Sequence, residues 1–182
     1  MLLTGDIKPG IIRLGENNVD IYPNKGIHIN NLGQIEFRGT ARIGNNCFIS
    51  IGKSAQVTFG DNFRATAAFR LACYDSMTFG DNVRFGWDCL AMDTDFHKLT
   101  RKDGTTTKGY GPIQIGSNNW FGNGCRIMKN TSTPDYCSIA AGTWLSKPVD
   151  VPEYSVIGNK KEIGIIASGV YLDPNDCDID YE

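Results

Sequence analysis

Residues Ile115 to Gly158 read IGSNNWFGNGCRIMKNTSTPDYCSIAAGTWLSKPVDVPEYSVIG, and an apolar side chain recurs in this segment at every sixth position. Counting in sixes reaches eight positions, and all but Thr133 are apolar: Ile115, Phe121, Ile127, Thr133, Ile139, Leu145, Val151 and Ile157. At the chain's 41% hydrophobic content, eight random positions would hold about three apolar residues. Neither an α-helix nor a two-residue strand alternation sustains a period of six. The period therefore predicts stacked coils with flat faces, each built from three hexapeptides.

The residues that follow the lattice positions are suited to tight corners. Many are small, as at Gly116, Gly122, Ala140 and Gly158. Asn and Asp, which tolerate left-handed backbone geometry best after Gly, are concentrated in four segments: 43–46, 59–62, 79–82 and 115–118. The pattern indicates an all-β solenoid whose coils bury their apolar faces only against their neighbours.

The lattice divides the chain into five parts within a single domain, 1–182: an N-terminal segment, two runs of coils separated by a loop, and a C-terminal segment. Residues 1–34 lack it and are interpreted as an irregular N-terminal cap and first coil. From Ile35 to Met92 the corners at 44, 60 and 80 are spaced by 16 and 20 residues, which predicts coils near 18 residues with small bulges. The lattice stops at Asp93 and resumes in register, since 115 − 91 is four hexapeptides. Residues 93–112 must therefore project as an extruded loop, which is usually functional, and residues 159–182 form a C-terminal cap and acidic tail.

Composition argues against several classes of protein. A formal net charge of −2 over 182 residues gives no reason to expect nucleic acid or an anionic membrane surface as a partner. Six cysteines without a CxxC pair indicate buried thiols in a reducing compartment, neither a zinc site nor a disulfide framework. The N-terminus has no basic leader with an apolar core, and no apolar tract is long enough to span a bilayer. We therefore expect a cytoplasmic protein with no membrane insertion.

Three segments resemble the hexapeptide-repeat acyltransferases, which have a left-handed parallel β-helix, and among them the sugar O-acetyltransferases. They are residues 92–97 at the start of the loop, 115–123 where the coils resume, and 138–148 near the end. The last two are similar to the family's Ile-Gly-Asn-x-x-Trp-Ile-Gly and Gly-Ala-Gly-Ser-x-Val-x-Lys signatures. The resemblance implies left-handed coils, a homotrimer with active sites between neighbouring prisms, and acetyl-CoA as acyl donor without a metal.

The resemblance and the chemistry of acyl transfer together suggest site residues. A sugar hydroxyl needs a base, and His97 is the loop histidine. If residues 93–97 are extended, Asp93 and Asp95 both point the same way as His97, and either carboxylate could orient the imidazole, with Asp95 favoured. The cofactor-binding candidates are Trp120, Asn123, Ala141, Ser146, Lys147 and Lys161, with Lys147 facing a phosphate of coenzyme A. Asp88 and Asp93 are the substrate-binding candidates, and a backbone N–H at a groove corner would stabilise the oxyanion.

The sequence leaves other functions open. The leading hypothesis is an acetyl-CoA-dependent O-acetyltransferase of a surface-polysaccharide carbohydrate, with direct transfer because no nucleophilic Ser or Cys adjoins His97. An N-acyltransferase acting on an amino-sugar nucleotide or small amine would use the same donor groove. A noncatalytic β-helix scaffold is a third class, but it leaves the interruption at 93–112 unexplained. A carbonic-anhydrase-like zinc site would need three histidines, and only His28 and His97 are present.

Overall fold

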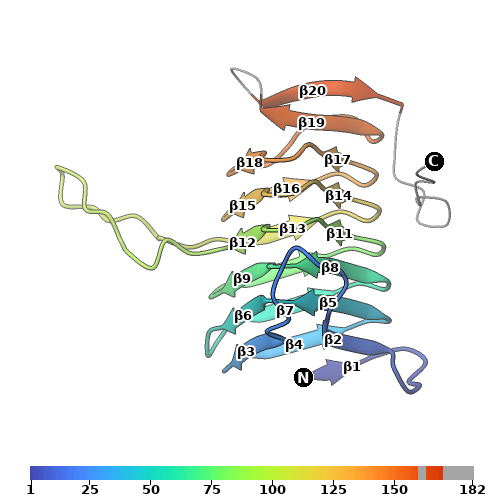
Figure 1. The fold of residues 1–182 in the computed structure, drawn as a ribbon. Helices are drawn as coiled ribbons and strands as arrows, with labels where there is room; N and C mark the ends of the chain where they lie inside the picture. Colours follow the sequence, from blue (N-terminus) through green and yellow to red (C-terminus); the bar gives the residue numbers. More distant parts are fainter. Residues whose placement is uncertain (160–162, 170–182) are drawn as a thin grey trace.

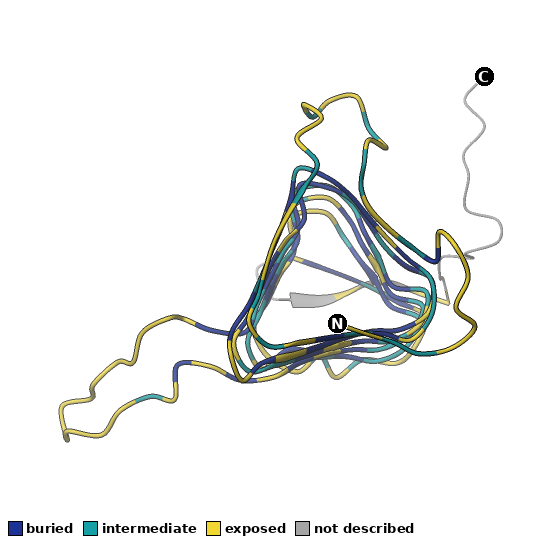
Figure 2. Ribbon diagram, turned by 90° about the horizontal axis from the view of Figure 1, so that it is seen from below, coloured by how far each residue is buried: buried dark blue, intermediate teal, exposed yellow. Residues whose placement is uncertain are grey.

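The chain winds into a left-handed parallel β-helix. The structure is a computed structural model that describes residues 1–159 and 163–169. Successive coils stack along one axis, and seen along that axis they superpose into a triangle with one long loop leaving a corner (Figures 1 and 2). The three flat sides are parallel sheets, called here sheets A, B and C in the order the chain visits them. The sequence prediction of an all-β hexapeptide solenoid is confirmed.

Each coil contributes one short strand to each sheet. Sheet A contains β1 (Leu2–Leu3), β4 (Gln34–Phe37), β7 (Gln56–Phe59), β10 (Ser76–Phe79), β13 (Ile113–Ile115) and β16 (Ser132–Thr133). Sheet B contains β2 (Ile12–Glu16), β5 (Ala41–Asn45), β8 (Phe63–Ala67), β11 (Arg84–Phe85), β14 (Trp120–Phe121), β17 (Ser138–Ile139), β19 (Ser155–Asn159) and β20 (Ile163–Ser168). Sheet C contains β3 (Ile27–Asn31), β6 (Cys47–Ile51), β9 (Arg70–Cys73), β12 (Leu90–Met92), β15 (Arg126–Met128) and β18 (Trp144–Leu145).

The core is a column of apolar side chains that point into the triangle. Of the eight lattice positions from Ile115 to Ile157, all are buried except Val151, which is half-buried and packs against the core. In the middle coils the column is aromatic: Phe85 stacks on Phe121 with ring centroids 4.5 Å apart, and Phe59 stacks on Phe79 at 5.5 Å. The five described cysteines are also buried, with free thiols, as the sequence predicts.

The early coils are longer than the later ones. Phe37 pairs with Phe59 in sheet A, and Phe59 pairs with Phe79. The differences 59 − 37 and 79 − 59 both exceed three hexapeptides, whereas Ile115 pairs with Thr133, and 133 − 115 equals three hexapeptides. Strands stay in register across these lengths, so the extra residues are taken up between the strands. These extra residues correspond to the bulges that the uneven corner spacing before residue 93 predicts.

The corners between sheets A and B are built from the predicted Asn residues. Asn62, Asn82 and Asn118 have φ values of 56°, 58° and 57°, in the left-handed region that Asn tolerates. Their side chains form a ladder along the corner, because each amide donates to the next, from Asn62 to Asn82 at 2.9 Å and from Asn82 to Asn118 at 3.0 Å. The same residues thus turn the chain and tie one coil to the next.

Both ends of the chain extend the stack. Residues 1–34 are more regular than expected, since β1, β2 and β3 give the first coil a strand in every sheet. Between β2 and β3, residues 17–26 form a loop that rises over the neighbouring coils (dark blue in Figure 1). At the other end, β20 pairs antiparallel with β19. The predicted acidic tail beyond residue 170 and the cofactor candidate Lys161 lie outside the described residues.

We expect the Phe85→Ala substitution to lower the free energy of unfolding by about 3–5 kcal/mol. Phe85 is 1% exposed and touches rings both in its own coil and in the coils on either side of it, so truncation opens a cavity that the stacked strands cannot close. Urea unfolding followed by circular dichroism measures the loss. Phe48→Ala is the control, because Phe48 is 50% exposed and should cost less than about 1 kcal/mol. Equal losses for the two variants would contradict the column as the source of stability.

Candidate functional site

Residues 93–112, called here the arm, project from the corner between sheets C and A (Figure 1). The two halves of the arm pair with each other, because Thr94 bridges Tyr110 and Thr100 bridges Thr106 in antiparallel fashion. Backbone hydrogen bonds join Asp95 N to Gly109 O at 2.7 Å and Thr107 N to Leu99 O at 2.9 Å. The predicted extruded loop is therefore a hydrogen-bonded hairpin and not an irregular loop.

Asp93 anchors the base of the arm. Its carboxylate is fully buried and accepts hydrogen bonds from the backbone N–H groups of Tyr74 at 2.7 Å and Asp75 at 2.9 Å. Burial raises the pKa of Asp93, although those two backbone hydrogen bonds act in the opposite direction. A fully enclosed carboxylate has no surface to offer a substrate. We therefore correct the substrate-binding assignment of Asp93: the side chain holds the corner from which the arm departs.

The chain turns before it reaches His97. Phe96 has a φ of 59°, and its N–H bonds the Oγ1 of Thr94 at 3.0 Å. The segment is therefore not extended, and the expected alternation that would place Asp95 beside His97 does not occur. The carboxylate of Asp95 instead pairs with the ammonium group of Lys129, in the next coil. This ion pair ties the arm to the prism, and the imidazole of His97 is exposed, without a hydrogen-bond partner among the described residues.

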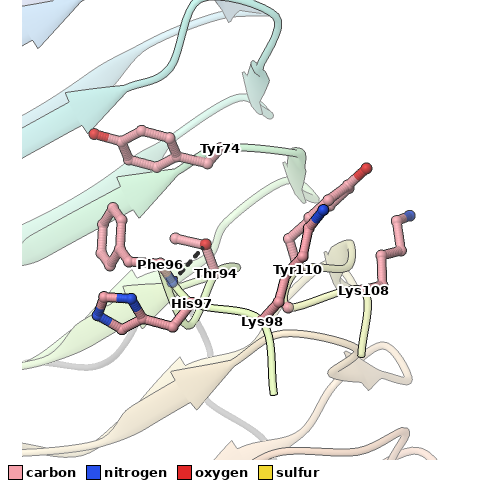
Figure 3. A pocket seen from close by; sticks show the side chains of 8 residues that line it. Tyr74, Thr94, Phe96, His97, Lys98, Lys108 and Tyr110 are labelled. Carbon is pink, nitrogen blue, oxygen red and sulfur yellow. Dashed lines mark hydrogen bonds between the residues drawn. The ribbon is translucent and has the colours of Figure 1, made fainter. Parts of the chain in front are cut away.

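His97 lines a hollow of about 280 Å³ between the arm and the prism. Tyr74, Phe96 and His97 lie on one side of it and Tyr110 and Lys108 on the other (Figure 3). Tyr74 and Phe96 meet edge to face with ring centroids 4.9 Å apart. The hollow combines aromatic walls with an exposed imidazole and the side chains of Lys98 and Lys108, an arrangement that suits a polar organic substrate. Tyr74 was missed by the sequence reasoning because it lies one coil earlier.

A second group of candidates lies on sheet B and on the corner between sheets B and C. Trp120 stands on the outer face of sheet B and is 42% exposed. Asn123 and Ala141 are exposed on successive coils at the corner, where Gly142 N donates to Asn123 O at 2.8 Å. The amide oxygen of Asn123 accepts from Trp87 N at 3.0 Å, so this side chain is held in place.

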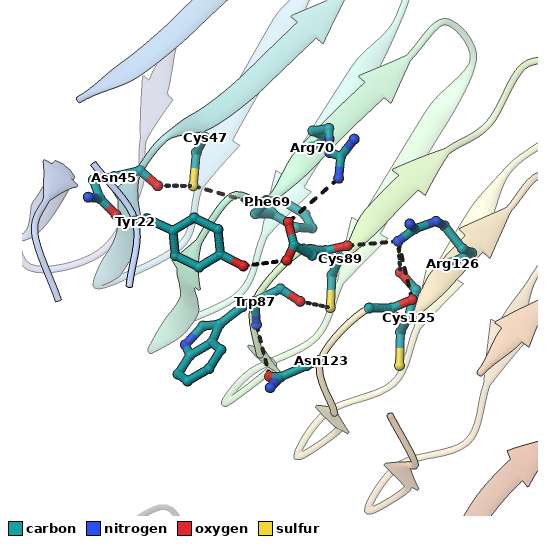
Figure 4. A network of polar contacts seen from close by, with 12 residues as sticks. Tyr22, Asn45, Cys47, Phe69, Arg70, Trp87, Cys89, Asn123, Cys125 and Arg126 are labelled. Atoms are coloured by element: carbon teal, nitrogen blue, oxygen red, sulfur yellow. Dashed lines mark hydrogen bonds and ion pairs between the residues drawn. The ribbon is translucent and has the colours of Figure 1, made fainter. Parts of the chain in front are cut away.

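Asp88 lies at the same corner, one coil before Asn123, and its carboxylate already has partners. Figure 4 shows two of these partners, Tyr22 and Arg70, together with Trp87 and Asn123. Its carboxylate accepts a hydrogen bond from the Tyr22 hydroxyl and lies 3.7 Å from a guanidinium nitrogen of Arg70. Burial, reinforced by the bond to Asp88, raises the pKa of Tyr22 to about 12. Tyr22 belongs to the 17–26 loop and also packs edge to face on Trp87 at 6.4 Å. The sequence held no signal for this contact, which joins two segments far apart along the chain.

The predicted site residues therefore fall into two groups on one prism. His97 and the exposed pair Ser146 and Lys147 belong to the corner between sheets C and A. Trp120 is on sheet B, and Asn123 and Ala141 are at the corner between sheets B and C. The width of sheet C separates the two corners. A single chain does not bring the proposed base and the proposed donor groove together.

Within residues 1–159 and 163–169 the structure has neither a metal-binding cluster nor a membrane-spanning helix. No three His, Cys, Asp or Glu side chains in these ranges are grouped as a metal ion would require. The same residues contain no helix of the length and hydrophobicity needed to cross a bilayer.

The fold is the left-handed β-helix found in solved acyl- and acetyltransferases. One such structure is the polySia-specific acetyltransferase NeuO, with a TM-score of 0.62 and 22% identity over 82% of this chain and 74% of that one. Another is AntD, an N-acyltransferase from Bacillus cereus solved with dTDP and coenzyme A, with a TM-score of 0.62 and 17% identity over 79% and 78% of the two chains. No family model and no curated protein sequence matches the chain.

We expect Gly109→Ala to loosen the arm at His97. Gly109 has a φ of +75°, and an added Cβ would lie 2.6 Å from the carbonyl oxygen of His97. Gly104→Ala is the matched control, because Gly104 has a φ of +82° but open space around the same position. Both variants carry the strain of a left-handed alanine, about 1–2 kcal/mol, and only the first has the clash. Tryptic cleavage at the Lys and Arg residues of the arm should accelerate several-fold more in Gly109→Ala. Equal rates would contradict this role of Gly109.

Proposed function

We propose that this protein is an acetyl-CoA-dependent O-acetyltransferase that modifies a hydroxyl of a carbohydrate. The observation that carries the proposal is the exposed imidazole of His97, unpartnered among the described residues, on an arm that interrupts a β-helix. Support also comes from the likeness of this fold to NeuO, an acetyltransferase specific for polySia, and to AntD, which was solved with coenzyme A. The carbohydrate acceptor would be a precursor or repeat unit in surface polysaccharide biosynthesis.

In this proposal His97 is the general base. Its free ring nitrogen takes the proton from the acceptor hydroxyl while the hydroxyl oxygen attacks the carbonyl carbon of the thioester. The tetrahedral intermediate carries its negative charge on the former carbonyl oxygen, where a backbone N–H at a coil corner stabilises it. The carbon–sulfur bond then breaks, and the leaving thiolate of coenzyme A takes the proton from the imidazolium. Transfer is direct, without an acyl-enzyme intermediate.

The donor would lie along sheet B and its corner with sheet C. The exposed ring of Trp120 forms a wall for the acetyl group and the pantetheine arm, and the backbone at Asn123 and Ala141 supplies hydrogen bonds to the amides of that arm. Ser146 and Lys147 share the corner between sheets C and A with His97, so in a site formed between chains they would reach the phosphates from the neighbouring chain, and Lys161 would add charge. Asp88 already accepts a hydrogen bond from Tyr22 and pairs with Arg70. Its carboxylate oxygens would accept a further hydrogen bond from the carbohydrate.

Two groups of site residues on separate corners favour an assembly in which one chain completes another. The proposed assembly is a homotrimer whose sites lie between neighbours, with His97 of one chain facing Trp120 of the next. The arm also carries apolar side chains that its own prism leaves uncovered, since Phe96 is 55% and Leu99 66% exposed. Covering such surface is a general driving force for association.

An amine acceptor is the alternative, because AntD is an N-acyltransferase with the same TM-score to this chain as NeuO. The donor side would be unchanged. A panel of hydroxyl and amino sugars, assayed for acetyl transfer with one donor, separates the two activities.

Acetyl-CoA titrated into the protein should bind with micromolar to sub-millimolar affinity at about one site per chain. His97→Ala should keep that affinity and the melting temperature while turnover falls by about 10² to 10⁴, because only proton removal is lost. Calorimetry and an acetyl-transfer assay measure the two effects, and Lys102→Ala is the control, because Lys102 is an exposed residue of the arm that does not line the hollow. Turnover within a few-fold of wild type would remove His97 from the mechanism, and absence of heat at two temperatures would favour a noncatalytic β-helix.

Mixed assemblies test where the site is formed. Co-expressed His97→Ala and Trp120→Ala chains, each of low activity alone, should regain activity together. If each site takes His97 from one chain and Trp120 from the next, random mixing leaves about a quarter of the sites intact. A site contained within one chain predicts no recovery, because every chain then carries one defect.

A further inference from the structure

Four arginines stand in a row on the outer face of sheet B. Arg13 of β2 lies beside Arg42 of β5, Arg42 beside Arg64 of β8, and Arg64 beside Arg84 of β11. The next residue in the row is Trp120 of β14. We call the four arginines the arginine row. It runs from the N-terminal end of the prism to the residue proposed above to wall the donor groove.

Such a row is unfavourable for the folded chain by itself. Neighbouring strands lie about 4.8 Å apart, and like charges directly opposite each other on paired strands are destabilising. The charge is local, since the whole chain has a formal net charge of −2. Arg13 has an ion pair with Glu16 at 3.6 Å. Arg42 is exposed and has no hydrogen bond or ion pair among the described residues.

Three of the four arginines, at the N-terminal end of the row, line a hollow of about 330 Å³. Its charged residues are Lys8, Arg13, Arg42 and Arg64, and no carboxylate is among the residues that line it. Arg64 is oriented by its Nε, which donates to Asn62 Oδ1 at 3.2 Å, and Asn62 belongs to the corner ladder. The hollow is thus a cationic recess with at least one guanidinium group held in place by the coil corners.

The chemistry of the row identifies its ligand class. Guanidinium groups bind carboxylates through paired hydrogen bonds, and a row at strand spacing presents several of them along one line. A linear polymer with an anionic group on successive units matches this layout better than a single small anion does. The row ends at an exposed tryptophan, whose ring offers an apolar face to a sugar.

We propose that the outer face of sheet B binds an acidic glycan, with carboxylates on the arginine row and the chain running from the cationic recess towards Trp120. The glycan would be the acceptor of the proposed acetyl transfer, so its role as substrate rests on the proposed function, whereas its binding does not. The acetyl-CoA would then occupy the coils from Trp120 towards the C-terminus. The glycan would occupy the outer face of sheet B from the N-terminal coils up to Trp120.

Binding is tested with carboxylated oligosaccharides of graded length, oligogalacturonate and oligosialate, and with neutral maltooligosaccharides of matching length. The acidic series should bind, with affinity that increases with length and falls with salt, and the neutral series should not. Arg42→Gln should weaken binding about tenfold and Arg42→Gln with Arg64→Gln about a hundredfold. Lys53→Gln, which removes an exposed charge between β6 and β7, is the control and should change nothing.

Melting temperature separates binding from a structural role. Removing Arg42 should leave the unliganded protein as stable or more stable, because its like-charge contacts with Arg13 and Arg64 are lost. Loss of stability with unchanged glycan affinity would overturn the proposal, as would failure of both acidic series to bind at millimolar concentration. A parallel loss of coenzyme A affinity in the double variant would assign the row to the donor and also overturn it. If acetyl-CoA binds and the glycans do not, the glycan-binding proposal is wrong and the acyltransferase proposal is unaffected. If the glycans bind and acetyl-CoA does not, the acyltransferase proposal is wrong and the glycan-binding proposal is unaffected.

Discussion

The structure depends on one constraint, which is that each coil can bury its apolar face only against the coils on either side. Three short strands per coil are too small to form a core alone, so equivalent positions must stack in columns. Phe85 shows the consequence, because its ring packs on Phe121 above and near Phe63 below. The same stacking acts on outward side chains. A residue type repeated once per coil therefore becomes a row on the surface, whether Asn at the corners or Arg on sheet B.

This constraint also explains how much of the fold could be predicted. The lattice from Ile115 to Ile157 and the left-handed Asn corners are local, repeated signals, and both are present in the structure. The six-residue count does not run through the first coils, because their repeats carry extra residues between the strands. These residues interrupt the count without changing the register of the strands. Residues 1–34 held no lattice for the same reason, and yet β1, β2 and β3 form a complete coil.

The candidate site was less predictable than the fold, for two physical reasons. Asp93 and Asp95 have equal standing in the sequence, but backbone N–H groups at a corner need an acceptor, and Asp93 supplies it. The turn at Phe96 then sends Asp95 to Lys129 and leaves His97 exposed. Contacts across long separations, such as Tyr22 with Asp88, leave no trace in a periodic pattern. The loop at 17–26 therefore could not be connected with the corner at Asp88 in advance.

The arm and the arginine row together distinguish one coil of an otherwise regular prism from the others. A solenoid of identical coils would offer the same groove at every level, and nothing would select one coil for chemistry. The arm breaks that equivalence because it leaves the prism at one level, between β12 and β13. On sheet B, the row of arginines ends and Trp120 begins between β11 and β14, which flank the same insertion. One interruption in the repeat therefore fixes the level of the proposed base. At the same level the arginine row ends and, towards the C-terminal coils, the proposed donor groove begins. A polymer bound on sheet B would therefore meet the acyl group at only one coil.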